Sequence, residues 1–171
     1  MAEAAGLDGS QVLYDLFAGA GSIGIALAGG ARQVVAVEIS AEATADAERN
    51  ARANGVANHT AVAGDVGVVL RDRGDRLPPP DVVVVDPPRA GLAGRAVRRI
   101  LELGAPTLVY VSCQPATFAD NASRFVEGGY RLEWVRPVDM FPQTPHIESV
   151  ARFTREPAAP PGSATADGPV G

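Results

Sequence analysis

The 171-residue sequence contains no lysine, only one cysteine, and no apolar run that approaches the length of a membrane span. A single cysteine excludes an intramolecular disulfide, which favours a reducing, cytoplasmic location. A transmembrane helix needs about 20 consecutive apolar residues, so we expect a soluble protein with no membrane partner. The opening residues, MAEAAGLDGS, lack the basic and apolar segments of a secretory signal.

The positive charges are all arginines, fifteen in number, and the formal net charge is −5. An acidic protein binds a polyanion such as RNA only through a local basic patch. Four arginines fall between positions 89 and 99 and form a candidate patch: Arg89, Arg95, Arg98 and Arg99. Arginine can clamp phosphate through two parallel hydrogen bonds, but a general bias toward arginine over lysine would explain the cluster without any phosphate.

Apolar runs rich in β-branched residues alternate with alanine-rich, helix-like stretches, which is typical of βαβ units and a parallel sheet. The run VVVV has no polar alternation, as expected of a strand that is covered on both faces. The sequence therefore predicts an α/β fold with a mostly parallel, doubly wound sheet. We place strands at 11–17, 33–39, 60–64, 81–86 and 107–113, and helices at 22–29, 41–54, 92–104 and 115–128.

This rhythm changes after residue 129. Two strand-like runs, YRLEWVRPVDM and IESVARFTR, are joined by six residues, too few for a crossover helix, so they must run antiparallel. We expect the first to run parallel with its neighbours and the second, the last strand of the chain, to return antiparallel. One domain at 11–155 then follows a lead-in at 1–10. The tail at 156–171 has almost nothing to bury, and we expect it to be disordered.

A glycine-rich turn joins the first predicted strand to the first helix, in YDLFAGAGSIGIALA. Its G-x-G-x-x-G spacing, at 19–24, lets a ligand approach backbone amides, and dinucleotide and S-adenosylmethionine sites both use it. Glu38, at the end of the second strand, suits ribose hydroxyls in either case. Asp15 would repel a pyrophosphate but attract the ammonium of a methionine-like tail, which favours S-adenosylmethionine. Asp65 could accept from an adenine amino group, or be a solvated loop residue.

Three unusual groups follow the strands at the edge where open α/β sheets bind ligands. They are the segment DPPRAG at 86–91, Cys113, and Glu148, which the antiparallel return brings back to that edge. A thiolate that adds to carbon 6 of a pyrimidine makes carbon 5 nucleophilic, and a carboxylate can later remove the carbon 5 proton. We expect Arg89 or the helix at 115–128 to favour the thiolate. Otherwise Cys113 is a small buried apolar residue and Glu148 an exposed one.

The segments DPPRAG, YVSCQP and DMFPQTPHIE, in this order and spacing, resemble the signatures of the RNA 5-methyluridine methyltransferases, which modify tRNA or 23S ribosomal RNA. The resemblance covers residues 11–154. It implies a Rossmann-like class I methyltransferase fold, S-adenosylmethionine as cofactor, no metal, an RNA substrate that we take to be ribosomal rather than transfer RNA, and a monomer. It also implies Cys113 as nucleophile and Glu148 as general base. With the turn glycines, the implied cofactor contacts are Phe17, Gly19, Gly21, Ser22, Glu38, Asp65 and Asp86.

The sequence departs from the family pattern at two places near the thiol. Gln114 stands where the family usually has asparagine, and FADN at 118–121 replaces the more usual LARD, which removes a positive charge. Family members also carry an RNA-binding N-terminal half and an inserted substrate subdomain, which are absent here. We therefore expect the sequence to be a catalytic domain that depends on such a half to grip RNA.

Three other functions compete with this interpretation. An exocyclic-amino methyltransferase could use Asp86 to hold its target nitrogen, but these enzymes need no thiol and usually place an aromatic residue where Arg89 stands. A non-catalytic module that binds a partner or RNA would not need Cys113 and Glu148 together. A nicotinamide-dependent dehydrogenase is the least favoured, because of Asp15.

Overall fold

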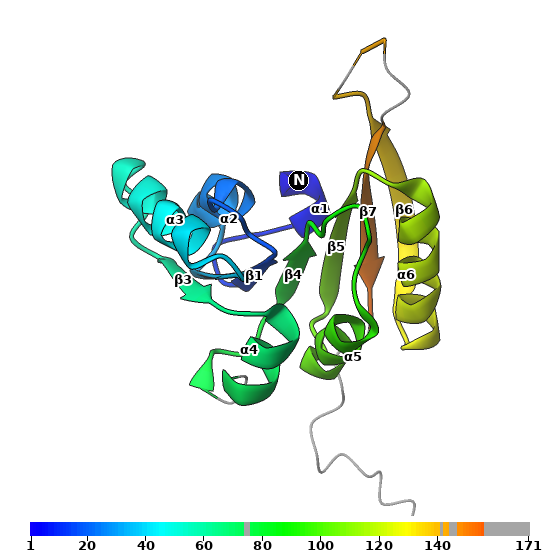
Figure 1. Cartoon of the computed structure of the whole chain (residues 1–171), viewed down its shortest axis with the longest axis horizontal. Helices are drawn as coiled ribbons and strands as arrows, with labels where there is room; N and C mark the ends of the chain where they lie inside the picture. Colours follow the sequence, from blue (N-terminus) through cyan, green and yellow to red (C-terminus); the bar gives the residue numbers. More distant parts are fainter. Residues whose placement is uncertain (74–75, 141, 144–146, 156–171) are drawn as a thin grey trace, which may run out of the picture.

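The computed structural model describes residues 1–73, 76–140, 142–143 and 147–155. Within these residues seven strands form one sheet of order β3-β2-β1-β4-β5-β7-β6 (Figure 1). The predicted tail at 156–171 lies outside the described residues. The strands are β1 (Val12–Leu16), β2 (Gln33–Glu38), β3 (His59–Ala63), β4 (Val82–Val85), β5 (Thr107–Ser112), β6 (Arg131–Val138) and β7 (Glu148–Thr154). The helices are α1 (Ala2–Ala5), α2 (Ser22–Leu27), η1 (Ala28–Gly30), α3 (Ala41–Ala53), α4 (Val66–Arg73), α5 (Gly94–Leu103) and α6 (Pro115–Glu127).

The predicted α/β architecture is confirmed. The first five strands pair in parallel, and each lies within about two residues of its predicted bounds. The hairpin after residue 129 is also antiparallel as predicted, and β7 is the antiparallel strand. Local signals mark the helix ends: Ser40 caps α3 by accepting the N–H of Ala43, and Pro115 stands in the first turn of α6.

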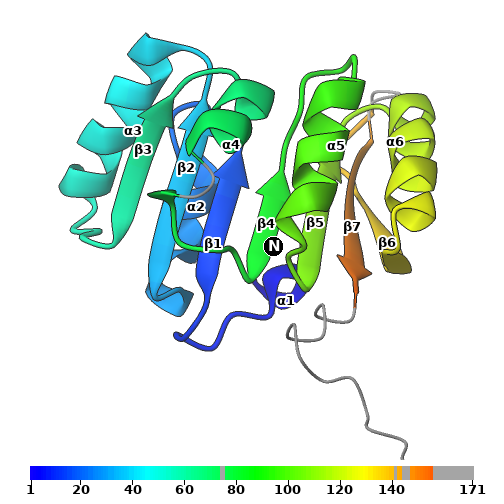
Figure 2. The ribbon, with the colours of Figure 1, turned by 90° about the horizontal axis from the view of Figure 1, so that it is seen from below.

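The position of β7 in the sheet differs from the prediction. This strand lies between β5 and β6 and is antiparallel to both, so β6 forms the edge of the sheet (Figures 1 and 2). The prediction that β6 has parallel neighbours is wrong. A six-residue connection fixes the relative direction of two strands, but it does not decide which of them pairs with β5.

Two short helices were not predicted. The helix α4 covers VGVVLRDR, whose glycine and β-branched valines are poor helix formers. The helix α1 lies within the predicted lead-in at 1–10, and its Ala4 and Ala5 are buried against β5 and β7. Packing against the sheet therefore stabilises helices that local propensity alone does not indicate.

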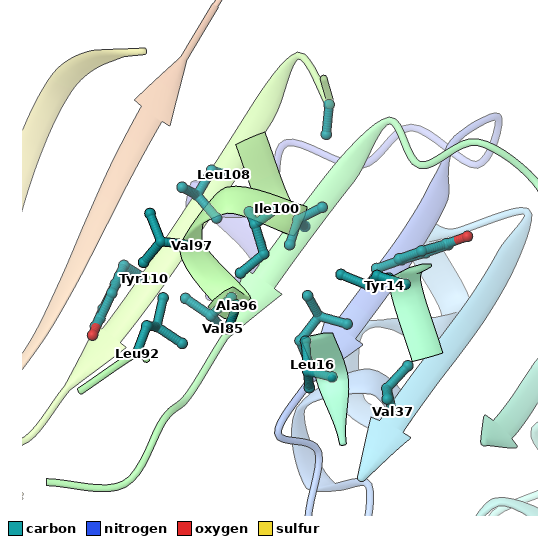
Figure 3. Packing of buried hydrophobic residues seen from close by; sticks show 14 of the residues in the cluster. Tyr14, Leu16, Val37, Val85, Leu92, Ala96, Val97, Ile100, Leu108 and Tyr110 are labelled. Carbon is teal, nitrogen blue, oxygen red and sulfur yellow. The ribbon is translucent and has the colours of Figure 1, made fainter. Parts of the chain in front are cut away.

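The hydrophobic core has two layers, one on each face of the sheet. Helices α4, α5 and α6 cover one face (Figure 2), where residues such as Tyr14, Val85, Ile100 and Tyr110 pack together (Figure 3). Helices α1 and α2 cover the other face, over Leu13 and Val84. The central strands are therefore buried on both faces. In the described part of the chain, no helix has the length and apolar character needed to cross a membrane.

Candidate active site

The predicted site residues gather at one edge of the sheet. The residues that end or follow the parallel strands lie there because parallel strands share a carboxyl edge. The start of β7 reaches the same edge because this strand runs the opposite way. The site residues at this edge are Phe17 after β1, Glu38 at the end of β2, Asp65 after β3, Asp86 after β4, Cys113 after β5 and Glu148 at the start of β7.

The turn between β1 and α2 has the strained backbone of a ligand-binding loop. Phe17, Gly19 and Gly21 all have positive φ angles, of 66°, 53° and 84°. A Cβ at Gly21 would lie 3.0 Å from the Cβ of Ala47, so glycine also permits close packing against α3. A positive φ angle is costly for a non-glycine residue such as Phe17. The exposed Ser22 follows as the first residue of α2.

Glu38 holds this turn in place. One carboxylate oxygen accepts the N–H of Gly19 at 2.9 Å, and the other accepts the N–H of Ser40 at 2.9 Å. Each carboxylate oxygen can accept a second hydrogen bond. Glu38 can therefore keep the turn folded and still bind hydroxyl groups of a ligand.

Asp15 does not lie where the sequence suggested. Its side chain is completely buried below the turn, and one oxygen accepts the N–H of Gly24 at 2.8 Å. The other oxygen is buried without a hydrogen-bond partner. Burial, and secondarily the negative charges of Asp86 and Glu38, raise the pKa of Asp15 to about 6. The expectation that Asp15 faces the ligand's ammonium is therefore wrong in this geometry, because β1 is covered on both faces.

Asp65 is engaged by two neighbours. One oxygen accepts the N–H of Val68 at 3.1 Å and so caps the start of α4, while the other pairs with Arg95 at 3.0 Å. The arginine stem crosses Gly67, where a Cβ would lie 2.7 Å from the Cγ of Arg95. Arg95 is thus the partner of a site carboxylate, which a cluster of arginines in the sequence could not indicate.

A cavity of about 420 Å³ opens at this edge, with apolar and acidic groups in its wall. The apolar contribution includes Ile39, which is 69% exposed, an unusual state for a large apolar residue. Sequence analysis missed Ile39, although it directly follows Glu38. A hollow of about 470 Å³ between α4 and α5 contains none of the predicted site residues. The cavity at the edge is lined by Phe17, Glu38, Ile39, Asp65, Val66, Asp86 and Pro88.

Cys113 and Glu148 lie at the same end of two neighbouring strands. The β5–β7 pairing ends with Ser112 opposite Ser149, and Cys113 and Glu148 are the residues next to this last pair. The thiol is free and half-buried, and it directly precedes Gln114, the N-cap of α6. The sequence could place both residues at one edge, and the register adds that both adjoin the same terminal pair of residues.

Asp86 lies close to this pair. Although the residue is solvent-exposed, partial burial of its carboxyl and the negative charge of Glu148 raise the pKa of Asp86. Tyr110 is buried beside them, and its pKa is raised by burial and then by the charges of Asp86 and Cys113. Asp86, which lines the cavity, is therefore close enough to Glu148 and to Tyr110 for their charges to influence one another. Among the described residues, no group of three or more His, Cys, Asp or Glu is arranged to hold a metal ion.

Most of the arginine patch is committed to acidic partners. Arg95 pairs with Asp65, while Arg98 and Arg99 pair with Glu102. In the described part of the chain, no ion pair involves Arg89, which is exposed next to the site. The arginine cluster therefore does not form a single phosphate clamp.

Comparison with known protein families identifies the family to which this chain belongs. The family model described as "Conserved hypothetical protein 95" matches residues 1–118, which carry the glycine turn and Cys113. The chain belongs to this family. Curated proteins similar to this chain are named as RNA methyltransferases. An uncharacterised RNA methyltransferase of Protochlamydia amoebophila is 46% identical over 151 residues, covering 88% of this chain and 34% of the relative. One of Enterococcus faecalis is 45% identical over 153 residues, covering 90% and 34%.

The solved structures that resemble this chain include two methyltransferases. A Pyrococcus abyssi tRNA (uracil-54, C5)-methyltransferase, in complex with S-adenosyl-L-homocysteine, superposes with a TM-score of 0.70 and 34% identity, over 86% of this chain and 35% of that one. A precorrin-6y C5,15-methyltransferase of Geobacter metallireducens, at 16% identity and a TM-score of 0.69, shares the fold over 90% of this chain and 84% of that one. This chain thus has the class I methyltransferase fold. It spans about a third of the length of the curated relatives described above.

Proposed function

We propose that this chain is the catalytic part of an enzyme that methylates carbon 5 of a uridine in RNA, with S-adenosylmethionine as the methyl donor. The observation that carries the proposal is that Cys113 and Glu148 both adjoin the last β5–β7 pair, at the edge of the sheet where the cavity bordered by Asp86 opens. A thiol and a carboxylate at one edge, in a fold of this class, suit a carbon that must first be made nucleophilic.

The cavity fits S-adenosylmethionine by the chemistry of its wall. The Glu38 carboxylate, at the end of β2, would accept the ribose hydroxyls, and the exposed Ile39 with Val66 and Pro88 would contact the adenine ring. Phe17 and the glycine turn would lie along the methionine-like part, with Ser22 and Asp86 as further polar contacts. Asp65 would accept from the adenine amino group through a remaining lone pair. When bound, this cofactor supplies an electrophilic methyl group.

The chain's own residues then perform two steps on the uracil ring. In the first, the Cys113 sulfur forms a bond to carbon 6, and the displaced π electrons make carbon 5 nucleophilic toward the methyl group. After methylation, the Glu148 carboxylate removes the proton from carbon 5, the electrons of that C–H bond restore the double bond, and the bond between sulfur and carbon 6 breaks. Glu148 afterwards releases the proton to solvent, and the thiolate is regenerated.

The N-terminus of α6 lies next to the sulfur. Cys113 directly precedes Gln114, the N-cap of α6, a 13-residue helix whose N-terminus carries a partial positive charge. In the proposed reaction this helix end would favour the thiolate, whereas no described contact joins the Arg89 guanidinium to Cys113. We therefore assign to Arg89 a contact with RNA phosphate at the rim of the site.

The relatives support RNA as the substrate. The curated relatives are named RNA methyltransferases, and the Pyrococcus structure is named for uracil 54 of tRNA. A net charge of −5 is unfavourable for RNA binding. RNA would therefore be gripped largely by the part of the longer relatives that this chain does not span.

The proposal is tested by covalent trapping. The chain is incubated with S-adenosylmethionine and RNA containing 5-fluorouridine, in which fluorine replaces the proton that Glu148 must remove. We expect a denaturation-resistant protein–RNA species that requires both the cofactor and Cys113. Separate reactions with tRNA and 23S ribosomal RNA transcripts identify the substrate. Full methyl transfer to unmodified RNA by Cys113→Ala would contradict the proposal and favour an exocyclic-amino methyltransferase.

A further inference from the structure

The buried side chain of Asn121 joins three segments of the chain. It lies on α6 with only 3% of its surface exposed. Its Oδ1 accepts the N–H of Leu92 at 2.7 Å and the hydroxyl of Tyr110 at 2.9 Å, and its Nδ2 donates to the carbonyl of Leu92 at 3.3 Å. An asparagine side chain can make about four hydrogen bonds, so three are in use. Helix α6, strand β5 and the loop after β4 therefore meet at one amide.

The loop between Asp86 and Leu92 passes unusually close to this amide. Gly91 has a φ of +73°, and a Cβ added there would lie 2.7 Å from the Oδ1 of Asn121 and 3.2 Å from the Cβ of Thr117. Only glycine fits at this position without moving α6. The segment DPPRAG thus contains a residue that allows the loop to lie directly against α6.

A second side chain holds the other part of this loop. The Thr117 hydroxyl is 3.1 Å from the carbonyl of Arg89 and 3.2 Å from that of Gln114, two alternative acceptors for its single proton. Thr117 and Asn121 are four residues apart, so they share one face of α6. Two side chains on one helix face therefore hold the loop at Arg89 and at Leu92.

The segments joined in this way carry the proposed reacting groups. Asp86 begins the loop, and Cys113 stands two residues before α6 begins and three after Tyr110. Figure 3 shows Tyr110 and Leu92 next to each other at one end of the core, where both reach Asn121. The pairing of Val85 with Tyr110 sets where the two segments leave the sheet, and the contacts of Asn121 add a second link between them beyond this pair.

We propose that Asn121 is a positioning residue that fixes the separation between Asp86 at the cofactor cavity and Cys113 at the uracil. The inference rests on the proposed function, because it concerns the alignment of the methyl donor with the thiol-bound ring. Asn121 touches neither donor nor ring. It acts by holding the DPPRAG loop and Tyr110 against α6.

The first experiment compares rate constants in three variants. Asn121→Leu has a similar volume but no hydrogen bonds, and a misplacement of about 1 Å should lower kcat for methyl transfer by about 10²-fold, with little change in KM for S-adenosylmethionine. Asn121→Asp retains both acceptor bonds of Oδ1 and should recover most of that rate. Asn58→Leu is the control, because it also removes side-chain amide bonds that join separate segments: Asn58 donates to the carbonyls of Ala28 and Ala31, away from the cavity. It should lower thermal stability without this loss of kcat.

A second readout requires no methyl transfer. Hydrogen exchange at the Leu92 amide and alkylation of Cys113 by iodoacetamide should both change in Asn121→Leu and remain unchanged in Asn58→Leu. Equal kcat in the parent and a folded Asn121→Leu, or equal losses in both leucine variants, would overturn the inference. A parent chain that traps no 5-fluorouridine RNA would instead count against the proposed function. In that case, unchanged exchange and alkylation in Asn121→Leu would overturn the positioning role by itself.

Discussion

The backbone N–H of Gly24 donates to the buried carboxylate of Asp15 at 2.8 Å, directly below the glycine-rich turn. A Cβ on Gly24 would lie 2.9 Å from that same oxygen and 3.0 Å from the Cγ1 of Val34. Helix α2 therefore approaches β1 so closely that only the hydrogen of Gly24 fits against the Asp15 carboxylate. The third glycine of the motif is explained by this packing.

We predict that Gly24→Ala destabilises the protein by about 1–3 kcal/mol, as expected for an added methyl group in a packed interior. The turn should shift with α2, and binding of S-adenosylmethionine should weaken in parallel. Chemical denaturation and calorimetric titration measure the two effects. Gly29→Ala is the control, since a Cβ at Gly29 meets nothing within 4 Å. Equal stability of both variants would show that the close approach at Gly24 is not maintained in solution.

Asp15 should make stability depend on pH. Its pKa is raised to about 6, mainly by burial, so the folded state binds the proton more tightly than the unfolded state. The resulting stabilisation is complete below the unfolded pKa of about 4 and is lost as the pH rises through 6. Asp15→Asn cannot ionise and keeps an acceptor for Gly24. We expect it to be more stable than the parent at pH 8, by up to about 3 kcal/mol.

Urea denaturation at pH 4 and pH 8 measures this difference. Asp8→Asn serves as a control with the opposite sign, because hydrogen bonds from Ser10 lower the pKa of the exposed Asp8. The stability that Asp8 contributes is present at neutral pH and lost as the pH falls through its lowered pKa. If Asp15→Asn were equal to the parent or less stable at pH 8, Asp15 would be held ionised by a group that binds it in solution.

Glu148→Gln should separate the two halves of the proposed reaction. Glutamine cannot remove the carbon 5 proton, so addition of the thiol and methylation would proceed while release of the product stops. We expect a covalent protein–RNA species on ordinary uridine-containing RNA and a loss of turnover of about 10²–10⁴-fold, the usual contribution of a general base. Gel electrophoresis under denaturing conditions detects the species. Glu127→Gln, on the exposed end of α6, is the control. Normal turnover by Glu148→Gln would assign the proton to another base.

Glu38→Gln should weaken cofactor binding and loosen the turn together. The glutamine amide would place an N–H group against the N–H of Gly19 or Ser40, both of which now donate to Glu38. We expect the Kd for S-adenosylmethionine to rise by at least about tenfold, which corresponds to about 1.4 kcal/mol. Glu42→Gln, in the first turn of α3, should leave the Kd unchanged. An unchanged Kd in Glu38→Gln would remove Glu38 from the cofactor site.

Local patterns were sufficient to predict the parallel part of the sheet. A run such as VVVV requires cover on both faces. Acidic residues that end parallel strands lie together, because these strands share one carboxyl edge of the sheet. The pairing of Asp65 with Arg95 was not predictable, because thirty residues separate them and an exposed arginine has many potential partners. Asp15 was misassigned for a related reason. Its burial depends on α2 packing over β1, which the residues of β1 alone do not specify.

The order of the last three strands could likewise not be predicted from the sequence alone. The connection between β6 and β7 is short enough to force an antiparallel pair, but the placement of β7 beside β5 results from long-range pairing. In the sequence, Asn121 stands out only because FADN at 118–121 departs from the family's more usual LARD. Its contacts with Leu92 and Tyr110 join segments that lie 29 and 11 residues away.

The insertion of β7 between β5 and β6 ties the proposed reaction to a single hydrogen-bonding register. If β7 slipped by one residue during folding, Glu148 would turn to the opposite face of the sheet, because successive side chains alternate. A slip of two residues would keep its face but move it about 7 Å along the strand. Such a misfolded chain would have the correct composition, secondary structure and mass, yet no base near its thiol. Loss of activity on refolding, without loss of helix or strand content, would therefore be the characteristic failure of this protein.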